Sequence, residues 1–144
     1  QSPLIVATDV RNMTHVMNQT LLNSEVIALH QSTETKPGRL LSECGSLTCQ
    51  VWGREIPTTQ LDLEVPKGWM VALVNTGSSD QNITVTWTDI ALPLNSTASV
   101  HNVWDGTLFG SASERWTASV PSHGTMLVRI QPDIVSKSRH PLMH

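Results

Sequence analysis

The charged and titratable side chains of this chain do not form an evident catalytic pair. Asp9 follows an apolar run and Arg11 comes two residues later, so this pair of opposite charges stands at the end of a buried segment. Asp62 and Glu64 alternate with apolar residues, which predicts that they lie on the solvent face of a strand. His123 sits in a Pro-Ser-His-Gly turn, and we expect it to bond to the backbone rather than to act as a base. The sequence therefore contains no convincing pair of carboxylates for general acid–base catalysis.

The tryptophans allow two interpretations, because indole rings both fill protein cores and stack on sugars. The chain has 5 Trp against 1 Phe and no Tyr. Trp87 and Trp116 fall on the inward phase of their predicted strands, and Trp69 opens a continuous apolar run. A buried indole removes roughly 150 to 250 Å² from water. We therefore favour core packing over a carbohydrate-binding surface.

The two cysteines lie on either side of a short turn. Cys44 and Cys49 are separated by Gly-Ser-Leu-Thr, between strand-like runs at 39–41 and 50–52. This spacing favours a disulfide that closes a hairpin, with a pair of reduced thiols as the alternative. A zinc site would need more ligands than this turn supplies.

Four Asn-X-Ser/Thr sequons indicate passage through a glycosylating compartment. Asn82, on the outward phase of a strand, and Asn95, in a loop after Pro93, are the preferred glycan carriers, ahead of Asn12 and Asn18. Gln1 is neither an initiator methionine nor part of a signal peptide, so we expect that any targeting signal was removed. Together with the predicted disulfide, the sequons predict a secreted or lysosomal/vacuolar protein.

Composition excludes several kinds of partner. The net charge is −3 and no long basic run is present, so the chain has no electrostatic signature for nucleic acid. No apolar stretch approaches the ~18 residues that a membrane-spanning helix needs.

The elements that must position these residues fall into two regions. Residues 4–7 are continuously apolar, which predicts a parallel strand covered on both faces and paired with strands outside this chain. Apolar residues at three- and four-residue spacings then predict two short helices, capped by Thr14 and Asn23. From about Pro37 the pattern becomes strand-like, with strict alternation at 61–65 and 82–87, and turn signals between the strands. The second region is therefore predicted to be an antiparallel β-sandwich with Greek-key connections.

Blocks of sequence along the whole chain resemble, in order, the C-terminal part of glycoside hydrolase family 27, the α-galactosidases and α-N-acetylgalactosaminidases. The first is Pro-Leu-Ile-x-x-x-Asp-Val-Arg-Asn-Met with the Val-Ile-Ala helix that follows, which resembles the last strand and helices of the catalytic barrel. The others resemble the family's C-terminal β-domain: residues 50–54, 68–75, 102–104 and 120–124.

The resemblance implies a domain plan. Residues 1–31 would be the final strand and helices of a (β/α)8 barrel, 32–36 a linker, 37–132 the antiparallel β-sandwich and 133–144 a tail. Trp52 and Trp104 match core-strand positions of the sandwich. The catalytic barrel segment would be the partner of this chain, and homo-oligomer formation is left open.

The resemblance also implies a function. The complete protein would be a retaining glycosidase that removes terminal α-linked galactose-type sugars without a metal or other cofactor. Its catalytic aspartates would lie on earlier strands, so this chain would hold no catalytic residue. Asp9 and Arg11 would support the rim of the active site, or form a purely structural pair. The departure at 30–35, where the family usually has Asn-Gln-Asp-Pro-Leu-Gly, keeps open a non-catalytic glycoprotein that uses the architecture for assembly or sugar binding.

Overall fold

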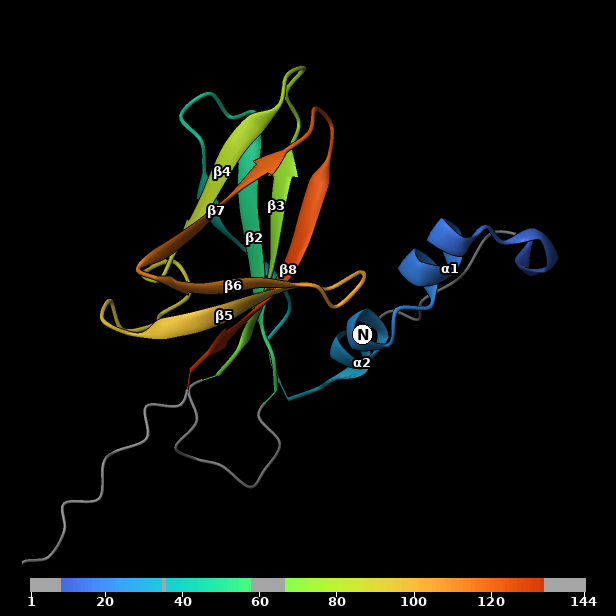
Figure 1. Cartoon of the computed structure of the whole chain (residues 1–144), viewed down its shortest axis with the longest axis horizontal. Helices are drawn as coiled ribbons and strands as arrows, with labels where there is room; N and C mark the ends of the chain where they lie inside the picture. Colours follow the sequence, from blue (N-terminus) through green and yellow to red (C-terminus); the bar gives the residue numbers. More distant parts are fainter. Residues whose placement is uncertain (1–8, 35, 58–66, 134–144) are drawn as a thin grey trace, which may run out of the picture.

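The computed structural model describes residues 9–34, 36–57 and 67–133. The predicted barrel strand at 4–7, the alternating run at 61–65 with Asp62 and Glu64, and the tail from residue 134 lie outside the described residues. A short helical arm precedes a sandwich of two sheets, and the arm lies to one side of the sandwich (Figure 1).

The arm begins with a single 3-10 turn, η1 (Val10–Asn12), which is followed by α1 (His15–Leu21) and α2 (Ser24–Gln31). Both predicted caps are confirmed, since the side chain of Thr14 accepts a hydrogen bond from the Met17 amide and that of Asn23 accepts one from the Val26 amide. No residue of either helix is buried.

The antiparallel β-sandwich is also confirmed. A six-stranded sheet has the order β1-β2-β3-β8-β5-β6, and a two-stranded sheet pairs β4 with β7. The bounds are β1 (Arg39–Glu43), β2 (Cys49–Glu55), β3 (Trp69–Asn75), β4 (Gln81–Thr86), β5 (Thr97–Asn102), β6 (Leu108–Ser113), β7 (Arg115–Val120) and β8 (Thr125–Pro132). The chain crosses between the sheets several times, and β8 returns between β3 and β5.

The core lies between the two sheets and follows the predicted alternation. Ile83 and Val85 of β4 are buried, as is Trp87 just beyond it, whereas Thr84 and Thr86 lie on the outer side. Trp87 donates its indole N–H to the Ser96 carbonyl at 3.0 Å, so this large ring is buried with its polar group satisfied. The principal buried residues are Val51, Trp69, Val71, Leu73, Ile83, Val85, Trp87, Val100, Val120, Val128 and Ile130.

The predictions for the tryptophans are correct for three and wrong for two. Trp69 is buried, Trp87 is fully buried and Trp116 is partly buried against the core. Trp52 is 40% exposed, because its inward-facing neighbours Val51 and Gly53 place it on the opposite face of β2. Trp104 is half-buried in the turn after β5 rather than in a core strand.

Candidate functional site

Asp9 and Arg11 form an exposed ion pair at the start of the arm. The Arg11 Nε atom lies 3.0 Å from Asp9 Oδ1, which also accepts a hydrogen bond from the Arg11 amide at 3.1 Å. Asp9 therefore caps the η1 turn, and Asn12 donates a further side-chain hydrogen bond to Asp9 Oδ2. The side chain of Arg11 is the main cause of a lowered pKa at Asp9. A carboxylate held in this way stays ionised and suits electrostatic support better than proton transfer.

Among the described residues, three polar contacts tether α2 to the sandwich. Glu25 Oε1 lies 2.9 Å from Arg129 Nη1 of β8, and Arg54 of β2 donates to the Ser32 carbonyl at 2.9 Å. Asn23, at the start of α2, donates to the Val103 carbonyl at 2.8 Å. The helix is thus held at both ends by residues of the sandwich.

Two of the three tethers, Arg54 and Arg129, belong to one row of residues across the sheet. Arg54, Met70, Arg129 and His101 are successive partners on β2, β3, β8 and β5. Met70 points away from the core yet is only 7% exposed. Its partners on the two neighbouring strands, Arg54 and Arg129, are the residues that bond to α2 and its C-terminal cap.

The neighbouring row on the same sheet face is apolar, and we call it the apolar row. Its members are paired across four strands, from β1 to β8: Leu40, Trp52, Ala72 and Leu127. Leu40 is 38% exposed and Trp52 is 40% exposed, while Ala72 and Leu127 are half-buried. The Trp52 indole N–H donates to Gln50 Oε1 at 3.0 Å, and the Gln50 amide donates to Glu43 Oε1 at 3.2 Å.

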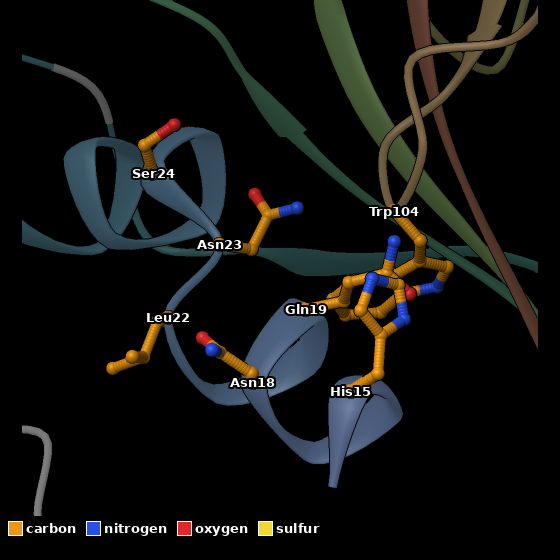
Figure 2. Close-up of a pocket in the computed structure, with 7 residues that line it drawn as sticks. All are labelled: His15, Asn18, Gln19, Leu22, Asn23, Ser24 and Trp104. Carbon is orange, nitrogen blue, oxygen red and sulfur yellow. The ribbon is translucent and has the colours of Figure 1, made fainter.

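An open groove of about 380 Å³ separates α1 from the turn that carries Trp104. Figure 2 shows the side chains of His15 and Gln19 beside the Trp104 indole, with Leu22 farther from that ring, just after α1. The Trp104 amide donates to Asn102 Oδ1 at 3.0 Å, which fixes the turn. The groove is lined by His15, Asn18, Gln19, Leu22, Asn23, Ser24 and Trp104.

The opposite side of α1 carries three apolar side chains that the described residues leave partly exposed. Met17 and Leu21 are one helical turn apart and Val16 lies beside them, away from the groove. Val16 is 69% exposed and Leu21 is 37% exposed, and Met17 is half-buried. Helix α1 therefore turns a mostly polar side to the turn that carries Trp104 and a mostly apolar side away from it.

The remaining predicted residues occupy the surface and one hairpin. Cys44 and Cys49 are joined by a disulfide that closes the β1–β2 hairpin, and Cys49 is buried. The sequon asparagines Asn12, Asn18, Asn82 and Asn95 are all exposed. His123 is exposed in the β7–β8 turn, where its φ of 55° is in the left-handed region.

The described residues contain no group of three or more His, Cys, Asp or Glu side chains that could hold a metal ion. No helix within the described ranges is long and apolar enough to cross a membrane.

A family profile described as "Alpha galactosidase C-terminal beta sandwich domain" matches residues 48–130 of this chain. The chain belongs to this family. The match begins at the β1–β2 turn and continues into β8, so it includes most of the sandwich.

Relatives of this α-galactosidase C-terminal domain extend the similarity to the helical arm. An alpha-galactosidase of Coffea arabica is 28% identical over 132 residues, which is 92% of this chain and 32% of that protein. Alpha-galactosidase 3 of Arabidopsis thaliana is 30% identical over 140 residues, which is 96% of this chain and 30% of that protein. The chain thus spans about a third of the length of these relatives.

Solved structures share the fold of this chain over most of its length. Alpha-galactosidase I of Mortierella vinacea aligns with a TM-score of 0.72 and 27% identity, over 90% of this chain and 32% of that one. The GH27 β-L-arabinopyranosidase of Geobacillus stearothermophilus aligns with a TM-score of 0.69 at 18% identity, which is a likeness of fold. The predicted resemblance to the C-terminal part of glycoside hydrolase family 27 is confirmed.

Two features of this surface were not predicted from the sequence. The exposure of Trp52 had a signal, because strict alternation through Val51, Trp52 and Gly53 places the indole outward once Val51 faces the core. The Glu25–Arg129 pair had none, since its partners are 104 residues apart and meet only through the order of the strands.

Proposed function

We propose that this chain is the C-terminal part of a retaining α-galactosidase or α-N-acetylgalactosaminidase that removes terminal α-linked galactose-type sugars. The observation that carries the proposal is the alignment with the coffee alpha-galactosidase, which extends over 92% of the chain. It therefore includes the helical arm as well as the sandwich. An arm with no buried residue and an uncovered apolar side fits a part of a larger catalytic unit.

In this proposal residues 1–31 complete a (β/α)8 barrel, 32–36 link it to the sandwich at 37–132, and 133–144 form a tail. Retention of configuration requires two carboxyl groups about 5 to 5.5 Å apart, one as nucleophile and one as acid and base. Both would belong to the barrel segment outside this chain. Asp9 and Arg11 would lie where a barrel strand ends, the face on which barrel enzymes place their sites, and would support its rim.

The role of the sandwich is mechanical. It would hold α2 against the outer sheet face through Arg129, Arg54 and Asn23, and thereby fix the last helix of the barrel. Substitutions in the sandwich should then alter activity through stability.

The direct test is an assay of the complete protein with aryl α-galactosides and aryl α-N-acetylgalactosaminides. We expect hydrolysis, with the α-anomer as the first product detected by NMR. A folded complete protein that hydrolyses neither substrate would contradict the proposal and favour the non-catalytic glycoprotein.

We also propose that the protein matures in the secretory pathway and is secreted or lysosomal/vacuolar. The support is the disulfide between Cys44 and Cys49 and the exposure of all four sequon asparagines, of which Asn82 and Asn95 are the preferred glycan carriers. Intact mass before and after deglycosylation, with alkylation of free thiols, tests both points. Free thiols together with an unglycosylated chain would contradict this localisation.

A further inference from the structure

We propose that the apolar row is a second contact between the sandwich and the catalytic segment, with Trp52 as its anchor. This inference rests on the proposed function, because it takes the preceding barrel segment as the partner. It adds a surface on the sandwich itself to the contact made through the helical arm.

The first argument is continuity. The apolar row lies beside the row of Arg54, Met70 and Arg129, of which Arg129 pairs with Glu25 of α2 and Arg54 donates to Ser32 at the end of α2. The two rows are two residues apart along β2 and β3, where Trp52 pairs with Ala72 and Arg54 pairs with Met70, so they are neighbours on the same sheet face. A body attached to α2 is therefore in reach of the apolar row.

The second argument is composition. The four members of the row carry no charge, and two of them, Leu40 and Trp52, are large side chains that are more than a third exposed. Protein contacts are depleted in charge at their centre and enriched in tryptophan. A row of this kind on an antiparallel sheet favours cover by another protein surface over exposure to water.

The third argument is that Trp52 is already ordered. Its indole N–H is satisfied by Gln50, and Gln50 is in turn held by Glu43 on the neighbouring strand. The ring therefore needs no polar partner from outside and loses little side-chain freedom when it is covered. Rigid aromatic side chains with these properties are typical anchors of protein interfaces.

The fourth argument concerns the occupant. The chain spans about a third of its relatives, so their remaining length is large enough to supply the covering surface. The apolar side of α1, which includes Val16 and Leu21, is also uncovered and points away from the sandwich. One preceding segment that packs on α1 and continues past α2 would cover both surfaces.

The test is oxidative footprinting of the complete protein, in which hydroxyl radicals label exposed side chains. Phe109 is the internal reference, because it is 44% exposed on the edge strand β6 and outside the apolar row. After correction for intrinsic reactivity, we expect the labelling of Trp52 to be several-fold lower than that of Phe109. Equal labelling of the two residues would overturn the inference.

A pair of variants gives a second readout. We expect Trp52→Ala to lower the thermal unfolding midpoint of the complete protein more than Phe109→Ala does, and equal midpoints would contradict the anchor role.

The assay with aryl α-glycosides on the same wild-type protein separates the two proposals. Protection of Trp52 without hydrolysis would overturn the enzymatic proposal alone, whereas hydrolysis with Trp52 exposed would overturn only this inference.

Discussion

The sandwich and the helical arm are stabilised in different ways. The sandwich buries large apolar side chains between two sheets, and its one buried polar residue among those described, Asn75, has hydrogen-bond partners for both its amide nitrogen and its oxygen. The arm has no buried residue and is held by three polar contacts at its second helix. The sandwich thus has a core of its own, whereas the described arm has none, and the proposed domain plan makes it a piece of another core.

The comparison predicts that a tryptophan in the core of the sandwich and one at its junction with the arm differ in their effect on stability. Trp87→Ala in the complete protein should lower the free energy of unfolding of the sandwich by about 3 to 5 kcal/mol, because it removes a fully buried ring. Trp104→Ala, at the groove beside the arm, should cost clearly less, because that indole is half-buried. Denaturant unfolding followed by circular dichroism measures both, and equal losses would contradict the assignment of Trp87 to the core and Trp104 to the junction.

A substitution at Asn75 tests how much the hydrogen bonds of a buried polar side chain contribute to the stability of the sandwich. Its side-chain nitrogen donates to the carbonyls of Ser79, Val120 and Pro121, so Asn75→Asp would direct a carboxylate at three carbonyl oxygens. We expect a loss of about 3 kcal/mol at neutral pH, since the buried donors are lost and a charge is introduced. The loss should shrink as acid neutralises the new carboxyl group.

The matched control is Asn102→Asp. Asn102 accepts a hydrogen bond from the Trp104 amide through its oxygen, which an aspartate can still do. Thermal unfolding at neutral and acidic pH should show a large, pH-dependent effect at position 75 and a small effect at 102. A similar effect at both positions would show that the hydrogen bonds of Asn75 are not what matters.

Weakening the Glu25–Arg129 pair between the arm and the sandwich should affect α2 more than the stability of the whole protein. Glu25→Gln weakens the pair with Arg129, and both side chains are more than a third exposed, so we expect a change of about 0 to 1 kcal/mol in unfolding free energy. Hydrogen exchange at α2 should nevertheless accelerate, because the pair holds the start of this helix. Glu55→Gln, which weakens the exposed pair with Lys67, is the control and should leave α2 unchanged. Unchanged hydrogen exchange at α2 in both variants would show that the Glu25–Arg129 pair does not hold the start of this helix.

The smallest expected effect is the pH response of Asp9. The Arg11 side chain lowers the pKa of Asp9 in the folded protein, so this pair contributes above the ordinary aspartate pKa and its contribution is lost as pH falls through the lowered value. NMR titration of the carboxyl group should show the low pKa in the wild type and a return toward the ordinary value in Arg11→Ala. If the complete protein is the proposed glycosidase, Asp9→Asn should lower its turnover with little change in stability, and a loss of stability at unchanged turnover would favour a structural pair.

Local patterns predicted the sandwich well. The alternation through Ile83, Val85 and Trp87 predicted both the strand and its buried face, because a strand that is half-buried has a period of two. The helix caps at Thr14 and Asn23 were also predictable, since each acts within three residues of its own helix.

Contacts between distant segments could not be predicted in the same way. The Glu25–Arg129 pair and the hydrogen bonds of Asn75 to Val120 and Pro121 depend on which strands become neighbours, which no local pattern encodes. The core position expected for Trp52 is wrong for another reason. Its match to a core-strand position of the family conflicts with the alternation of its own strand, and the alternation places the ring outward.

Hydrogen exchange of the complete protein, measured by mass spectrometry, tests most directly whether the arm belongs to a second core. We predict that the amides of α1 and α2 exchange slowly, at rates comparable with those of the central strands β3 and β8, because in the proposed domain plan a catalytic segment covers the apolar side of the arm. Fast exchange throughout both helices, while β3 and β8 remain protected, would contradict this account.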